Sequence, residues 1–250
     1  MPDYRTKAER DAADRFARDV KDHKVVAIRE DGNYRHVEFT AQQGFTRIVL
    51  VTWPYNLLVA GSHGSFHFER YGDDSKDMFA WLRGLRVDPA SWASKLINGR
   101  DSVTQYDRSL LEKEVNERVA EAIKDKWAPK GLKAAVREEI LDSHWMNDEQ
   151  NALRLVSEFQ HGATYRAECS CGATGDDGSY DAAVNWKWSI HKNDDDAHKV
   201  SIRQTGGFDF DGFEEWNVRK LTSHYLWACH SAVWGIARYD AVMAAKRVAA

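Results

Sequence analysis

The feature that most constrains this 250-residue chain is a change in the spacing of its apolar residues near Gly72. From Val25 to Tyr71, β-rich or alternating runs are separated by short turn sequences at positions 31–33, 42–44 and 61–64. Such turns join antiparallel neighbours, because parallel strands need crossover connections of a dozen or more residues. We therefore predict a meander of about five antiparallel strands in this segment.

Beyond Gly72, apolar residues recur at the spacing of an α-helix. This spacing predicts helices at about 75–83, 89–97, 110–127, 132–141, 151–159, 180–190 and 215–245, and a further one at 3–22 before the meander. The predicted class is α+β: an N-terminal antiparallel β-meander with flanking helices, followed by a mostly helical C-terminal half.

The polar stretch 99–107 is the best candidate for a boundary within the chain. We divide the sequence there into a helix-plus-sheet region (1–100) and a helical region (101–165). A Gly- and Asp-rich insertion (166–215) and a long C-terminal helix (216–250) follow.

Composition limits the classes of function. The formal net charge of −4 argues against direct nucleic-acid binding, which normally shows a basic surplus. We expect no signal peptide, because the N-terminal segment is charged and lacks an apolar core. The most apolar run, 226–237, is shorter than the ~20 residues that span a bilayer. Three cysteines, two of them one residue apart, indicate a reducing compartment. We expect a cytosolic protein without membrane contact.

Two cysteines and two histidines form a candidate metal cluster: Cys169, Cys171, His191 and His198. Two thiolates and two imidazoles are a ligand set of structural zinc, although zinc sites usually place two to four residues between their cysteines. The passage 165–172, with a short helix ending at His191, resembles small Cys-x-Cys-Gly…His modules of actinobacterial and actinophage proteins. The alternative is a pair of reduced thiols beside a helix-terminal His, with no cofactor at all.

A candidate partner-binding face lies in the stretch from Gly172 to Glu215, where ten acidic residues oppose four basic ones. It includes Asp194, Asp195 and Asp196, and the tryptophans Trp186 and Trp188. Two tryptophans two positions apart on a helix do not both face the core, and exposed aromatics often anchor partners. The alternative is an acidic segment that keeps the protein in solution.

Two passages carry a family resemblance: WP…LLVAGSHGSFHF…DMFAWLR…VDPASWASKL within 53–96, and YLWACH…VWGIARYD within 225–240. Together they resemble a family of phage- and prophage-encoded proteins of unassigned function. The resemblance implies expression in the cytoplasm of a bacterial host. The order of the two passages implies that the last helix packs back on the N-terminal sheet, with Trp227 or Trp234 at the contact.

In that context we expect an accessory protein that binds a host macromolecule, with inhibition of a bacterial defence system as one such role. The expected partner is a host protein, for example one that binds nucleic acid through a basic groove. One alternative is an enzyme with a site at the strand rim formed by His63, His67 and Glu69. Another is a virion-associated protein. No phosphate-binding loop motif is present in the sequence, which argues against an ATP-driven or dinucleotide enzyme.

Overall fold

The computed structural model describes residues 6–41, 46–72, 76–190 and 198–249. The chain divides into two compact units. Unit 1 contains residues 1–105 and 220–250, and unit 2 contains residues 106–219. The predicted residues His191, Asp194, Asp195 and Asp196 lie outside the described segments.

Unit 1 is built on one five-stranded antiparallel sheet whose strands follow each other in chain order. The strands are β1 (His23–Asp31), β2 (Tyr34–Ala41), β3 (Arg47–Trp53), β4 (Asn56–Gly61) and β5 (Gly64–Glu69). The predicted meander is confirmed. Its register places Val37 opposite Leu50, and Leu50 opposite Val59, so that apolar side chains line one face across neighbouring strands.

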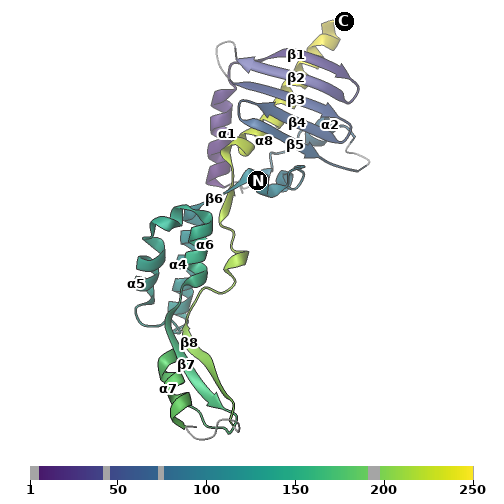
Figure 1. Cartoon of the computed structure of the whole chain (residues 1–250). Helices are drawn as coiled ribbons and strands as arrows, with labels where there is room; N and C mark the ends of the chain where they lie inside the picture. The colour runs from purple at the N-terminus through teal and green to yellow at the C-terminus, as the bar shows by residue number, and fades with distance from the viewer. Residues whose placement is uncertain (1–5, 42–45, 73–75, 191–197, 250) are drawn as a thin grey trace. The chain divides into compact units, whose positions relative to one another are not determined.

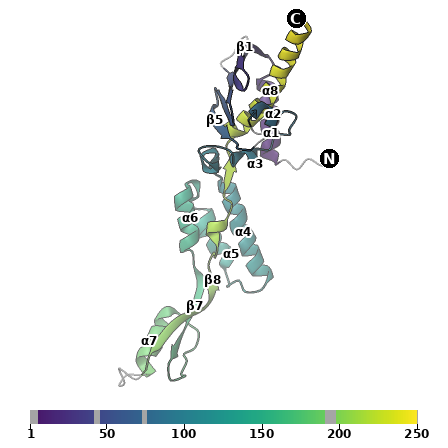
Figure 2. The same cartoon turned by 90° about the vertical axis from the view of Figure 1, so that its right-hand side faces the viewer.

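Helices cover that apolar face. They are α1 (Lys7–Asp19), α2 (Met78–Leu82), α3 (Pro89–Ala93) and α8 (Ser223–Ala249). Figure 2 shows α1, α2 and α8 on the same side of the sheet. The largest buried side chains of the sheet belong to one core cluster with residues of α2 and α8. Burial of this face, at about 25 cal/mol per Å² of apolar surface, is the main term that stabilises unit 1.

The C-terminal helix α8 runs behind the five strands in Figure 1 and approaches them closely at Gly235. A Cβ atom at that position would lie 2.7 Å from the Cδ1 atom of Leu50, so only glycine fits without a shift. One residue earlier, the Trp234 ring packs edge-on against Phe39 with centroids 5.1 Å apart. The expected contact between a tryptophan of the last helix and the sheet is therefore confirmed.

Unit 2 begins with helices. They are α4 (Arg108–Lys124), α5 (Leu132–Val136), a π-helical turn (Arg137–Leu141), a 3-10 helix (His144–Asn147) and α6 (Glu149–Glu158). Apolar residues four apart on α4, such as Leu111, Val115 and Val119, are buried in a second core cluster. The mostly helical character that the sequence predicts for this half is confirmed.

The second part of unit 2 is a small α/β substructure that the sequence predicts only partly. It contains β7 (His161–Cys169), α7 (Tyr180–Ile190) and β8 (Val200–Phe208), and β7 pairs antiparallel with β8. Helix α7 agrees with the prediction, whereas β8 was not predicted within its Gly- and Asp-rich segment. The partners of β8 come from β7, which precedes it by more than thirty positions, so its formation depends on tertiary pairing.

Two short elements also correct the predicted start of the last helix at about residue 215. Phe213–Glu215 form a 3-10 helix, and β9 (Arg219–Leu221) pairs with β6 (Thr104–Tyr106) before α8 begins at Ser223. A further 3-10 helix spans Arg100–Val103. None of the helices in the described segments is long and apolar enough to cross a membrane.

Candidate functional site

The candidate metal centre lies where β7 ends and β8 begins. Cys169, Cys171 and His198 each offer one ligand atom, and these three atoms lie within 4.8 Å of one another. The Cys169 Sγ atom is 3.5 Å from Nδ1 of His198. Bonds of about 2.3 Å to sulfur and about 2.1 Å to nitrogen at a tetrahedral angle would separate such ligands by roughly 3.6 Å. The distance between Cys169 and His198 therefore fits two ligands of one zinc ion.

Strand pairing brings His198 to the two cysteines. Cys169 lies opposite Val200 in the β7–β8 ladder. Beyond the ladder, the Ser170 N–H donates to the Lys199 carbonyl at 2.9 Å, and the Lys199 N–H donates to the Ser170 hydroxyl at 3.1 Å. These reciprocal bonds fix the residue next to His198 beside the cysteine turn, so the ligands are held by the fold.

The turn at Gly172 explains how two cysteines separated by one residue approach the same point. Gly172 has φ +92°, a conformation that favours glycine, and its N–H donates to the Cys169 carbonyl at 2.9 Å. The chain therefore reverses directly after Cys171. The segment that follows pairs with the free edge of β7, where the Cys169 N–H donates to the Ala173 carbonyl at 2.9 Å.

The local electrostatics favour a metal-binding thiolate. Hydrogen bonds from the Ala173 backbone N–H and from the Cys169 side chain lower the pKa of the exposed Cys171 thiol. A thiolate is the form that coordinates a metal. By contrast, burial raises the pKa of the third cysteine, Cys229 on α8, which is enclosed in the core of unit 1. All three cysteines lie in described segments and none forms a disulfide.

The two tryptophans of the predicted partner-binding face differ in exposure. Trp188 is 64% exposed, and the Lys187 ammonium lies 5.6 Å from its ring centroid. The ring of Trp186 packs over Gly175, because a Cβ atom added at Gly175 would lie 3.1 Å from atoms of that ring. Trp188 is thus the member of the pair that is available to a partner.

Sequence reasoning missed an acidic hollow in unit 2 of about 300 Å³. Its floor is aromatic, because Trp127 stacks on Phe208 with centroids 5.3 Å apart and planes 20° apart. Its carboxylates come from two separate segments: Glu121, Asp125, Asp209 and Asp211. Trp127 is 52% exposed. Asp209 and Asp211 belong to the acidic 172–215 stretch. Glu121 on α4 and Asp125 directly after α4 join them only through the tertiary fold.

The residues proposed for a strand-rim enzyme contact different partners. His63 lies against the α8 side chains His224 and Trp227, with ring centroids 5.3 and 4.3 Å away. His67 contacts Asn56, with 2.8 Å between Nε2 and Oδ1. Burial lowers the pKa of both histidines.

The third rim residue, Glu69, accepts a hydrogen bond from the Tyr71 hydroxyl. His67 and Glu69 lie two positions apart on β5, where the Glu69 charge raises the pKa of His67 against the effect of burial, whereas the ring contacts of His63 are with α8. Comparison with known proteins gives no match to the chain among family models, curated proteins or solved structures.

Proposed function

We propose that the protein is a non-catalytic binding protein whose unit 2 recognises a basic surface on a host macromolecule. The acidic hollow around Trp127 is the observation that carries this proposal. An indole face attracts a cation, and a charged side chain desolvated on it gains about 2 kcal/mol or more. Carboxylates around the ring add direct electrostatic attraction for a Lys or Arg side chain.

The charges of the hollow are unbalanced in favour of a cationic ligand. Among the described residues, four carboxylates and one basic side chain line it, and that side chain, Arg118, is 3.3 Å from the carboxylate of Glu121. Two of the carboxylates, Asp209 and Asp211, also belong to the stretch with ten acidic and four basic residues. A surface polarised in this way speeds encounter with a basic partner and selects against acidic ones.

The resemblance to phage-encoded proteins gives this chemistry a biological context. A host protein that binds nucleic acid presents a basic groove, and an acidic surface with an exposed indole is complementary to it. By occupying such a groove, this protein would block nucleic-acid binding by the host protein. Where the host protein belongs to a defence system, this blocking would inhibit that system. The protein would act in the cytoplasm of the bacterial host.

We also propose that zinc at Cys169, Cys171 and His198 has a structural role in the same unit. These residues join the end of β7 to the start of β8, and α7 with Trp188 lies between the two strands in the chain. A metal ion there would hold the two strand ends together. His191 was predicted as a further ligand, and it lies outside the described residues.

The binding proposal is tested with an Arg- and Lys-rich peptide as the probe, by surface plasmon resonance on the full chain. We expect a Trp127→Ala variant to raise Kd roughly tenfold. An Asp209→Asn, Asp211→Asn double variant should associate with the peptide more slowly at low salt. The difference from wild type should be smaller at physiological salt, where ions screen charges more than about 8–10 Å apart. A Trp145→Ala variant is the matched control, since Trp145 is exposed outside the hollow.

The outcome that contradicts the proposal is equal binding of the basic peptide by wild type and by both hollow variants. Equal binding of an acidic peptide of the same length would contradict it as well, because attraction between opposite charges would then not select the ligand.

A further inference from the structure

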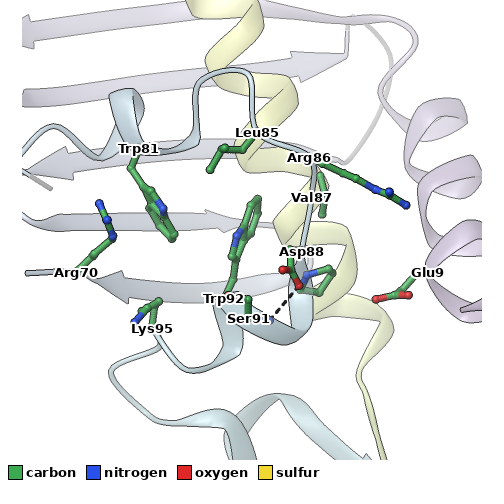
Figure 3. A pocket seen from close by; sticks show the side chains of 11 residues that line it. Glu9, Arg70, Trp81, Leu85, Arg86, Val87, Asp88, Ser91, Trp92 and Lys95 are labelled. Carbon is green, nitrogen blue, oxygen red and sulfur yellow. Dashed lines mark hydrogen bonds between the residues drawn. The ribbon is translucent and has the colours of Figure 1, made fainter. Parts of the chain in front are cut away.

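Unit 1 contains a hollow of about 710 Å³ formed by α2, α3 and the segment between them (Figure 3). Its aromatic surface is already covered. The Arg70 guanidinium lies 5.6 Å from the centroid of the Trp81 ring, and the centroid of the Trp92 ring lies 5.9 Å from it. Among the described residues that line this hollow there is no cysteine. The most nucleophilic side chains of the chain, its thiols, therefore lie elsewhere.

The three cysteines of the chain differ in their access to solvent. Cys171 is exposed in the turn after β7, whereas Cys169, at the end of that strand, is buried. Cys229 is enclosed in the core of unit 1. Susceptibility of a thiol to oxidation follows its exposure. A small oxidant therefore reaches Cys171 first and leaves Cys229 reduced.

The two thiols beside this turn are close enough to form a bond with each other. The Sγ atoms of Cys169 and Cys171 lie within 4.8 Å of one another. A disulfide needs Cα atoms about 4.4–6.8 Å apart. Two residues separated by one other in a turn meet this requirement, because even a fully extended chain advances only about 3.3–3.6 Å per residue. Rotation of the exposed Cys171 side chain is the movement that closes the remaining distance between the sulfur atoms.

Backbone hydrogen bonds on both sides of the turn keep the two thiols together. The Gly172 N–H donates to the Cys169 carbonyl at 2.9 Å, and the Ser170 N–H donates to the Lys199 carbonyl at 2.9 Å. The second thiol is therefore already in place when the first is oxidised. Such proximity converts a reaction between two molecules into one within a molecule and raises its rate.

We propose that Cys169 and Cys171 form a peroxide-sensitive dithiol, which hydrogen peroxide converts reversibly to a disulfide within the chain. In the first step, the Cys171 sulfur attacks one peroxide oxygen and the O–O bond breaks, which gives a sulfenic acid and one water. In the second step, the Cys169 sulfur attacks the Cys171 sulfur. The S–O bond breaks, and the hydroxyl group leaves with the Cys169 proton as a second water. Two electrons thus pass from the two sulfur atoms to the peroxide, and a dithiol reductant restores both thiols by thiol–disulfide exchange.

The same oxidation controls the proposed zinc site, and only this part of the inference rests on that proposal. A sulfur atom in a disulfide is no longer a thiolate, which is the form that coordinates a metal. Of the three described ligands only His198 then remains, so the ion is released. When the thiolates start from the zinc-bound form, the two protons of the waters come from solvent. The disulfide joins two residues of one turn, so it does not replace the metal link between β7 and β8.

The test is mass spectrometry of the full chain after treatment with hydrogen peroxide, with and without prior removal of metal by a chelator. The tryptic peptide 167–187 contains both cysteines of the turn. We expect peroxide to lower the mass of this peptide by about 2 Da, the mass of the two hydrogens lost, and to block alkylation of both thiols. Dithiothreitol should restore both thiols. Zinc-loaded protein should release about one zinc ion per disulfide formed, measured with a zinc-binding dye.

Two variants serve as controls. Cys229→Ala removes the buried thiol and should form the disulfide like wild type. Cys169→Ser removes the second thiol of the turn, so excess peroxide should add oxygen atoms to Cys171 that dithiothreitol does not remove.

The proposal is overturned if both thiols of wild type remain open to alkylation after peroxide treatment. Oxygen addition at Cys171 beside a free Cys169, or a disulfide between two chains, overturns it as well. Disulfide formation in protein that binds no zinc supports the dithiol and removes only the proposed zinc site. Zinc-bound protein whose thiols resist peroxide, both before and after removal of the metal, supports the zinc site and overturns the dithiol.

Discussion

The guanidinium of Arg83 donates two hydrogen bonds to the carboxylate of Asp240, at 2.8 and 2.9 Å, across a sequence separation of 157 residues. This pair joins the end of α2 to α8 within unit 1. Both side chains are more than one third exposed, so solvent screens their attraction. The contact therefore shows how α8 is oriented, while the buried rings nearby supply most of the stabilisation.

We expect an Arg83→Ala variant to lower the free energy of unfolding by less than about 1 kcal/mol. Chemical denaturation in low and high salt measures this change, and the difference should be smaller in high salt because ions screen the pair. A loss of several kcal/mol would mean that the ion pair, and not the packed core, fixes α8 on unit 1.

Gly235 should be among the least replaceable residues of α8. A Gly235→Ala change places a methyl group 2.7 Å from Leu50 and 3.2 Å from Phe39, so the helix must move away from the sheet. Overpacking of this kind costs about 1–3 kcal/mol, even though alanine favours helix formation. Denaturant unfolding compares this variant with Ala237→Ser, an exposed change on the same helix. A Gly235→Ala protein as stable as wild type would show that α8 lies farther from β3.

The Arg35–Asp77 pair should make unit 1 sensitive to acid. Although burial alone raises it, the pKa of Asp77 is lowered overall by two hydrogen bonds from Arg35 and by the N–H groups of Phe79 and Ala80. A carboxyl group with a lowered pKa in the folded state stabilises the fold above its unfolded-state pKa. That contribution is lost as the pH falls toward the folded-state value.

We therefore expect Asp77→Asn to lower the free energy of unfolding by about 1–3 kcal/mol at pH 7. The difference in free energy of unfolding between the variant and wild type should shrink as the pH falls below about 3.9. Below that pH, Asp77 of the unfolded wild-type chain is protonated and therefore neutral, like the Asn of the variant. Unfolding curves at several pH values measure this. Asp142→Asn serves as the control, because its partner Arg137 is largely exposed. A difference that does not vary with pH would contradict the role of the Asp77 charge.

Zinc binding is tested by elemental analysis of purified protein. We expect about one zinc per chain in wild type and in Cys229→Ala, whose thiol is buried in the other unit. Cys171→Ser and His198→Ala should each weaken zinc binding at least roughly tenfold. A chelator should lower the Tm of wild type and leave those two variants unchanged. Wild-type protein without zinc after growth in zinc-supplemented medium would exclude the site.

Local sequence was sufficient for the meander and for most helices. In the segment 25–71 the turn sequences lie between β-rich runs, and a tight turn admits only an antiparallel neighbour. Helix α7 likewise follows from its own sequence. The strand β8 does not, because Val200–Phe208 contains two adjacent glycines and becomes a strand only by pairing with β7.

The candidate sites show the same division. The sequence by itself determined the ligand types, since Cys169, Cys171 and His198 are recognisable from residue identity. Only the tertiary structure decided that the first two meet His198, because strand pairing and the turn at Gly172 set those distances.

The acidic hollow depends entirely on the fold. Trp127 lines it together with Asp209 and Asp211, because segments distant in sequence pack together. Secondary structure is governed by contacts between near neighbours, whose pattern can be read along the chain. A binding surface is instead formed by side chains from separate segments, and its composition is fixed only when the core that joins those segments is packed.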